Sequence, residues 1–188
     1  KATTGTWLDA AYPWDLLELN GLVVRGVQTE EGGIREPGVV IKGPVQVGEN
    51  TILRSNSYIM GPVLIGDGCE IGPNACIFPY TSLGNDVVVD PFTQLRNCII
   101  GNSVQIGSHS ILNDSIVAEG CTIGSRLTSP SSKQVRQADG EKVTIQIGAM
   151  IADFVIIGSG VSLGPGITVG RGANIRDMNI IREDVPEE

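Results

Sequence analysis

Aromatic side chains are scarce in this sequence of 188 residues, since tryptophan, tyrosine and phenylalanine together make up 4% of it. Charged residues account for 18%, and the formal net charge is −8. There is no apolar run of about 18 residues, so the sequence predicts no membrane span. No basic patch stands out, which argues against nucleic acid as a partner. The sequence has no recognisable signal peptide, and we therefore predict a cytoplasmic protein.

Cysteine and histidine are also few. The four cysteines show no Cys-x-x-Cys spacing, which argues against a zinc ribbon and favours buried thiols. The only histidine is His109. A metal site built from three histidines of one chain is therefore excluded.

Glycine is abundant, at 25 of 188 residues, against a usual share of about 7%. An aliphatic residue recurs at every sixth position over the first half of the chain. The series is Ile41, Val47, Leu53, Ile59, Ile65, Ile71, Ile77, Leu83, Val89 and Leu95. The residue two positions before each is small or β-branched, and glycine often follows the aliphatic residue. Internal repeats of this regularity indicate a solenoid.

A period of six fits neither a helix, whose apolar residues recur every 3.6 positions, nor a strand, with a period of two. It fits a coil with three flat sides, in which the aliphatic residue points inward and glycine or asparagine occupies the turn. Stacked coils then pair as parallel strands. We therefore predict an all-β fold, a left-handed parallel β-helix of about seven coils over residues 39–185.

The frame of the repeat slips twice, and the repeat is interrupted once. The frame slips by one residue after Leu95 and again after Leu112, either through bulges or through tolerated irregularities. Residues 125–144 are polar and lack the pattern, which predicts an extruded loop before the frame returns at Ile145. Residues 1–25 lack the repeat and include a short predicted helix at Tyr12–Asn20, in which Pro13 suits the first turn. Residues 26–38 are predicted to be a linker, and the acidic tail is predicted to fray.

The hexads resemble those of the hexapeptide-repeat transferases. The segment TGTWLDAAYPWDLLELN (Thr4–Asn20) is similar to the end of the nucleotidylyltransferase domain in archaeal and bacterial sugar-1-phosphate nucleotidylyltransferases. The segment Ile147–Gly170 is similar to the last coils of bifunctional enzymes that also acetylate glucosamine 1-phosphate. The resemblance implies that this chain is the carboxy-terminal part of such an enzyme, with residues 1–25 a remnant of the nucleotidylyltransferase domain.

The resemblance also implies roles for particular residues. Asp9 matches the aspartate that binds catalytic Mg²⁺ together with the nucleotidylyltransferase domain. His109 matches the catalytic base if one residue is deleted before Asp114, although the family's tyrosine is replaced near Leu112 and its loop asparagine is absent. The cations available for the sugar phosphate are Lys133, Arg136 and Lys142, and the positions nearest the family's acetyl-CoA contacts are Ala149, Ala173 and Arg182. Each residue also has an interpretation without a ligand. Asp9 would cap a turn, and His109 would be a surface residue. The three cations would belong to a solvated loop, the two alanines would fill corners of the solenoid, and Arg182 would be a solvated residue of the tail.

Two functions follow from these expectations. The first is an acetyl-CoA-dependent N-acetyltransferase acting on an amino-sugar 1-phosphate. The second is a non-catalytic trimerisation or regulatory module of a nucleotidylyltransferase. In both we expect a homotrimer, because flat sides pack against copies of themselves and cyclic symmetry closes the assembly. A γ-type carbonic anhydrase shares the fold but needs three histidine ligands, so it is disfavoured.

Overall fold

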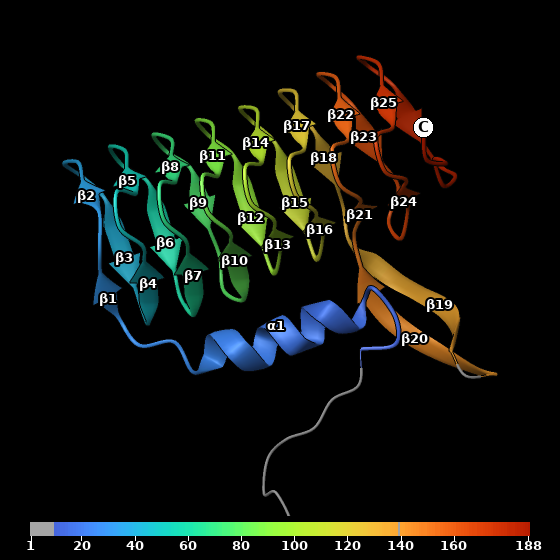
Figure 1. Ribbon diagram of the computed structural model, residues 1–188, viewed down its shortest axis with the longest axis horizontal. Helices are drawn as coiled ribbons and strands as arrows, with labels where there is room; N and C mark the ends of the chain where they lie inside the picture. The colour runs from blue at the N-terminus through green and yellow to red at the C-terminus, as the bar shows by residue number, and fades with distance from the viewer. Residues whose placement is uncertain (1–9, 139) are drawn as a thin grey trace, which may run out of the picture.

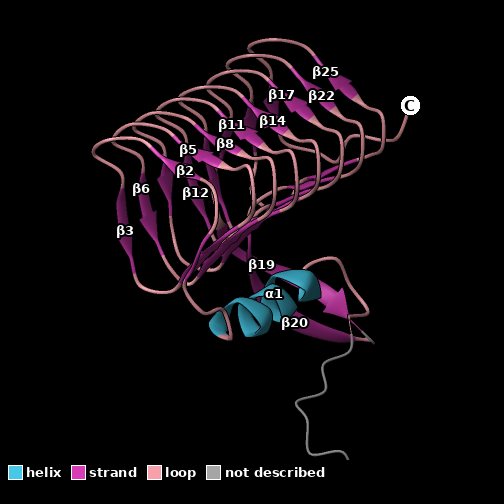
Figure 2. Ribbon diagram, turned by 60° about the vertical axis from the view of Figure 1, so that its left-hand side comes forward, coloured by secondary structure: helices cyan, strands magenta, loops and turns pink. Residues whose placement is uncertain are grey.

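The computed structural model describes residues 10–138 and 140–188. In this part of the chain one helix, α1 (Asp15–Arg25), precedes a three-sided β-solenoid (Figures 1 and 2). The three sides are parallel sheets of eight strands each, named here sheets A, B and C. The fold prediction of a parallel β-helix of the left-handed hexapeptide type is confirmed.

The strands follow one another around the solenoid in the order A, B, C. Sheet A contains β1 (Glu30–Glu31), β4 (Val45–Val47), β7 (Val63–Ile65), β10 (Thr81–Leu83), β13 (Ile99–Ile100), β16 (Ile116–Val117), β21 (Met150–Ile151) and β24 (Thr168–Val169). Sheet B contains β2 (Ile34–Arg35), β5 (Ile52–Leu53), β8 (Glu70–Ile71), β11 (Val88–Val89), β14 (Gln105–Ile106), β17 (Thr122–Ile123), β22 (Ile156–Ile157) and β25 (Asn174–Ile175). Sheet C contains β3 (Val40–Lys42), β6 (Tyr58–Met60), β9 (Cys76–Ile77), β12 (Gln94–Arg96), β15 (Ile111–Asn113), β18 (Thr128–Ser129), β23 (Ser162–Leu163) and β26 (Ile180–Ile181).

The predicted inward positions form the core. Leu53, Ile71 and Val89 are fully buried and stack in register on sheet B, with Leu53 paired to Ile71 and Ile71 paired to Val89. Each such pair joins residues 18 apart, which is three hexads. The turns between sheets, called here the AB, BC and CA corners, contain residues with positive φ, including Asn56 and Asn74 at the BC corner. Asparagine and glycine tolerate this backbone region, which explains their recurrence at the turns.

The solenoid has eight rungs instead of about seven, because it begins inside the predicted linker. Strands β1 and β2 pair with β4 and β5, so residues 26–38 supply the first two strands of the first rung. The predicted frayed tail is also ordered in part: Val185 bridges to Val169, and its N–H donates to the carbonyl of Thr168. Both corrections have the same cause. A terminal rung needs only backbone pairing on one side and can do without the full hexad pattern.

The extruded segment is a β-hairpin, and it is shorter at its start than predicted. Strand β18 remains in sheet C, with Ser129 buried at the inward position that an aliphatic residue usually occupies. The chain then leaves the CA corner and forms β19 (Ser132–Ala138) and β20 (Glu141–Ile147), which pair antiparallel. Ile145 belongs to this hairpin, so the predicted return of the frame at Ile145 is wrong. The next inward position on sheet A is Ile151.

The two frame slips are shortened CA corners, not bulges within strands. Across the corner from β12 to β13 the inward residues Leu95 and Ile100 are five positions apart, whereas across the corner from β9 to β10 the inward residues Ile77 and Leu83 are six apart. Asp114 and Ser115 make the next shortened corner, and Asn97 Nδ2 donates to Asp114 Oδ1 at 2.6 Å. Rungs in this region therefore pair residues 17 apart, as Val89 with Ile106 and Ile106 with Ile123.

Helix α1 lies along the outer face of sheet A and ends beside the first rungs (Figure 1). It begins three residues later than predicted and extends five residues further. Leu17 packs in a cluster with Ile147 and Met150, while Asn20 accepts a hydrogen bond from Ser82 Oγ at 2.6 Å and donates to the carbonyl of Tyr80 at 2.8 Å. The helix therefore covers the middle of sheet A and leaves the outer faces of sheets B and C open (Figure 2).

Candidate functional site at the BC corner

His109 is the third residue of a BC-corner turn between β14 and β15. Its backbone has φ of 60°, its side chain is exposed, and its N–H donates to the carbonyl of Pro91 at 3.0 Å. Positive φ is several-fold enriched for histidine and asparagine relative to most other side chains. The rung-to-rung hydrogen bond fixes the backbone, so the imidazole projects from a rigid corner.

Phe92 occupies the same turn position one rung earlier. The rings of Phe92 and His109 stack, with their centroids 4.9 Å apart and an interplanar angle of 24°. Stacking covers a face of the imidazole and leaves free the ring edge that contains both nitrogens. The structure therefore provides an oriented imidazole at the surface, which is the group that a general base for an amine requires.

Arg126 occupies the same turn position one rung later, and sequence reasoning missed it. Its N–H donates to the carbonyl of Ser108 at 2.8 Å, which sets it directly beside His109 on the corner. The hydroxyls of Ser108 and Ser125 lie 3.2 Å apart in the preceding turn position of these two rungs. The sequence signal for Arg126 is its spacing of 17 residues from His109, which equals the spacing of His109 from Phe92. This spacing becomes visible only when the frame slips are included in the alignment of the rungs.

The predicted phosphate-binding cations lie elsewhere. Lys133, Arg136 and Lys142 all belong to the hairpin, which leaves the CA corner at the opposite edge of sheet C from His109. Arg136 donates to the carbonyl of Gly166 at 2.6 Å and is half-buried, while Lys133 and Lys142 are exposed. Within one chain the structure does not bring these cations to His109.

The predicted acetyl-CoA residues are also separated. The side chains of Ala149 and Ala173 are buried inside the solenoid, at the CA and AB corners respectively, so neither side chain can contact a ligand. Their burial matches the corner-filling interpretation. Arg182 is exposed and follows the last strand of sheet C. Asp9, the predicted Mg²⁺ ligand, lies outside the described residues.

A cavity of about 570 Å³ lies beside the helix and is bounded by α1, Asn97 and strand β20. The stacked rings of Tyr12 and Trp14, 4.7 Å apart, form part of its wall. His109 does not line it. This cavity is therefore separate from the BC-corner site.

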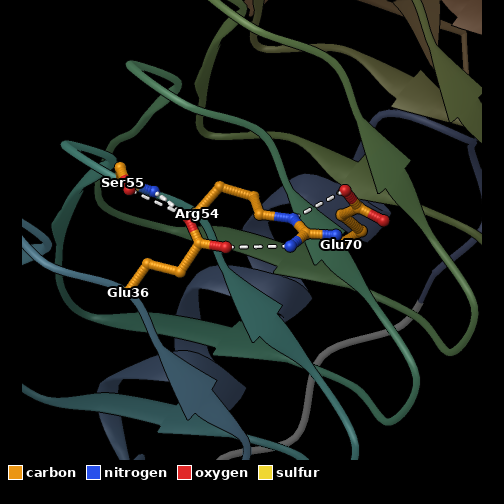
Figure 3. Close-up of polar contacts among 4 residues, drawn as sticks. All are labelled: Glu36, Arg54, Ser55 and Glu70. Atoms are coloured by element: carbon orange, nitrogen blue, oxygen red, sulfur yellow. Dashed lines mark hydrogen bonds and ion pairs between the residues drawn. The ribbon is translucent and has the colours of Figure 1, made fainter.

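A charged cluster links the first three rungs (Figure 3). Arg54 forms ion pairs of 2.8 Å with both Glu36 and Glu70, one rung before it and one rung after it. Hydrogen bonds from Arg54 and then from Ser55 lower the pKa of the Glu36 carboxyl, and the two carboxylates raise the pKa of Arg54. Both carboxylates pair with the one guanidinium, which indicates a clamp that holds the first rung and not a ligand site.

Two further searches cover residues 10–138 and 140–188 only. No group of three or more histidine, cysteine, aspartate or glutamate side chains is placed to hold a metal ion. The helix found there is too short and too polar to cross a bilayer.

Comparison with known proteins agrees with the resemblance. Residues 59–131 match the model of the GMPPB C-terminal domain. The bifunctional protein GlmU of Methanocaldococcus jannaschii is 42% identical over 120 residues, covering 64% of this chain and 29% of that protein. The bifunctional sugar-1-phosphate nucleotidylyltransferase/acetyltransferase of Sulfurisphaera tokodaii is 30% identical over 190 aligned positions, covering 96% and 47%. The chain is thus similar in sequence to bifunctional proteins of this kind.

The chain spans less than half the length of these two relatives. Its solenoid is similar to a solved structure of UDP-N-acetylglucosamine acyltransferase from Campylobacter jejuni, with a TM-score of 0.60 and 15% identity over 81% of this chain and 68% of that one. At this identity the similarity supports the fold alone. The missing tyrosine after His109 has a structural counterpart: Leu112 is fully buried in the core of the solenoid, so its side chain does not reach the surface beside His109.

Proposed function

We propose that this solenoid is an acetyl-CoA-dependent N-acetyltransferase domain that acts on an amino-sugar 1-phosphate, in a longer protein that also transfers a nucleotide to a sugar 1-phosphate. The observation that carries the proposal is the oriented imidazole of His109, stacked on Phe92 and exposed at a rigid corner. The name of the Sulfurisphaera tokodaii relative, which combines nucleotidylyltransferase and acetyltransferase activities, supplies the reaction class.

In the proposed reaction the sugar amine attacks the thioester carbonyl of acetyl-CoA, the C–S bond breaks, and CoA leaves as its thiol. His109 accepts the proton that the amine loses, because a neutral imidazole is a base of suitable strength near pH 7. Stacking on Phe92 restricts rotation of the imidazole, which lowers the entropy cost of placing its nitrogen on the amine. Mg²⁺ belongs, in this proposal, to the nucleotidyl transfer for which Asp9 is a candidate ligand.

We further propose a homotrimer as the assembly in which the site is complete. Helix α1 covers sheet A, so sheets B and C offer the faces for contact between copies. A hairpin from a neighbouring copy would supply the cations that one chain holds away from His109. The separation of these groups within a chain equally favours the alternative, a non-catalytic trimerisation or regulatory module.

The test combines acetyl-CoA titration by calorimetry with an acetylation assay on glucosamine 1-phosphate. The decisive variant is His109→Asn, because asparagine already occupies this turn position at Asn56 and Asn74 and keeps the backbone unstrained. Asn74→Gly, on the same corner, is the matched control. Turnover lost in His109→Asn and kept in the control is the expected result. A folded protein that neither binds acetyl-CoA nor acetylates the sugar would leave the non-catalytic module.

A further inference from the structure

The BC corner carries a row of hydrogen-bond donors beside His109. Arg126 follows His109 at the next rung, and the two backbones are tied by the ladder of which the Arg126 N–H to Ser108 carbonyl bond is part. The hydroxyls of Ser108 and Ser125 are within hydrogen-bond distance of each other at 3.2 Å. These side chains come from consecutive turns and face the same edge of the solenoid.

The Arg126 side chain is exposed, and no described residue among 10–138 and 140–188 forms an ion pair or hydrogen bond with it. Its position contrasts with that of Arg54, whose guanidinium is matched by two carboxylates. Gly160 follows Arg126 on the corner, and the thioether of Met178 lies in the space that a side chain at Gly160 would fill. Arg126 is therefore bounded by an imidazole on one side and an apolar group on the other.

Five N–H donors in a planar fork make a guanidinium the preferred partner of phosphate oxygens, and hydroxyls can complete the set. Two carboxylates lie on this corner two rungs from Arg126: Asp90, in the turn before that of His109, and Asp177, whose Oδ1 already accepts the N–H of Ser159 at 2.7 Å. The two turns that hold His109 and Arg126, residues 107–110 and 124–127, contain no carboxylate, so the charge that Arg126 places beside His109 is positive. We propose that Arg126, with the hydroxyls of Ser108 and Ser125, binds the phosphate of the amino-sugar substrate beside His109. This inference rests on the proposed function.

A phosphate at this point has two sources, the sugar 1-phosphate and acetyl-CoA itself. The spacing of the row favours the sugar. Neighbouring rungs lie about 4.8 Å apart, and a 2-amino sugar 1-phosphate carries its amine and its phosphate on adjacent ring carbons. The amine then meets His109 while the phosphate meets Arg126. The phosphates of acetyl-CoA lie a whole pantetheine arm away from the reacting thioester and would reach a more distant part of the surface.

The experiment uses Arg126→Asn, which keeps a residue suited to positive φ at this turn. The matched control is Arg176→Gln, an exposed arginine of the same corner in the last rung. In Arg126→Asn we expect the KM for glucosamine 1-phosphate to rise about 10- to 100-fold, with kcat and the KM for acetyl-CoA nearly unchanged. Acetylation of glucosamine, which lacks the phosphate, is expected to be equal in the parent and in both variants.

An unchanged KM for glucosamine 1-phosphate in Arg126→Asn would overturn the inference, as would a rise confined to the KM for acetyl-CoA, since the phosphate would then belong to the acyl donor. Calorimetric titration with glucosamine 1-phosphate separates this inference from the proposed function. Binding that depends on Arg126 without any acetylation would retain the phosphate site and refute the acetyltransferase. His109-dependent acetylation with no dependence on Arg126 would do the reverse, and no binding to the parent protein would refute the phosphate site.

Discussion

Ser57 and Ser110 occupy the same interior column at the BC corner, yet we expect the loss of their hydroxyls to have opposite effects on stability. The Ser57 hydroxyl is buried and finds no hydrogen-bond partner among the described residues. The Ser110 hydroxyl donates to the carbonyl of Gly107 at 2.7 Å and accepts the N–H of Leu127 at 3.1 Å. Ala75, one rung after Ser57, shows that a methyl group fits this column.

The expected magnitudes follow from these contacts. A buried polar group without a partner costs about 1–3 kcal/mol, so Ser57→Ala is expected to stabilise the protein by about 1 kcal/mol after the lost contacts of the oxygen are counted. Ser110→Ala removes two hydrogen bonds and leaves the buried N–H of Leu127 unpaired. We expect it to destabilise the protein by about 2 kcal/mol. The two variants would then differ by about 3 kcal/mol.

Urea denaturation followed by circular dichroism measures both effects, read as shifts of the midpoint at constant m value. Tryptophan fluorescence provides a second probe, because the rungs of a solenoid can unfold separately and the free energy is defined only if both transitions coincide. A loss of stability in Ser57→Ala, or a shift of both variants in the same direction, would refute this account of the column.

Three other predictions follow from burial and charge. Burial raises the pKa of the Cys98 thiol to about 12. Iodoacetamide at pH 8 is therefore expected to modify half-exposed Cys76 in the native protein and to reach Cys98 only in urea. Peptide mass spectrometry that finds equal labelling of the two cysteines in the native protein would contradict this prediction. Hydrogen bonds from Arg54 lower the pKa of Glu36, so the ionised carboxylate stabilises the fold above its unfolded pKa, and this contribution is lost as the pH falls through the lower folded pKa. The difference in urea midpoint between the parent and Glu36→Gln is therefore expected to narrow from pH 7 to pH 3, and a constant difference would argue against the clamp. Leu112→Ala is expected to cost about 2–5 kcal/mol and Leu112→Met less than about 1.5 kcal/mol, as measured by thermal and urea melts; equal losses would show that the core tolerates a cavity there.

The core of the solenoid was predictable because one rule, an aliphatic residue at every sixth position, repeats along the chain. The rule failed where another constraint replaced the aliphatic residue. At Ser129 the inward position holds a hydroxyl, which accepts the N–H of Ala149 at 3.0 Å and contacts Ser115 at the base of the hairpin. The N–H of Ala149, where the chain returns from the hairpin to the solenoid, needs this acceptor more than the core needs an aliphatic side chain. The aliphatic pattern therefore ended one strand before the chain left the solenoid, which it does after β18.

The hairpin left a signal that the hexad analysis did not include. Val135, Val143 and Ile145 alternate with polar residues, and an Asp-Gly pair at 139–140 separates the two halves of the segment. This is the pattern of two strands joined by a tight turn. A search for period two inside the gap in the hexads would have predicted β19 and β20 in place of a loop.

The site was predictable only in part. His109 stands out as the only histidine, and the structure places it in an exposed turn. The cations of the hairpin were grouped with it by resemblance, but which corner a residue occupies depends on the length of every preceding turn. The shortened corners at Asn97 and Asp114 change the count from 18 to 17, and it is this count that aligns Phe92, His109 and Arg126.

The stacking of rungs fixes the distances along the axis of the solenoid. Neighbouring strands in a sheet lie about 4.8 Å apart, so the distance along the solenoid from α1 to any turn can change only in steps of one rung, by insertion or deletion of about 18 residues. Insertion or deletion of one residue instead changes the length of one corner. It leaves the position along the axis of everything beyond that corner unaltered, as the shortened corners do. Positions along the axis are therefore quantised, whereas positions around it can be adjusted residue by residue, and the two coordinates of a surface site can be changed independently.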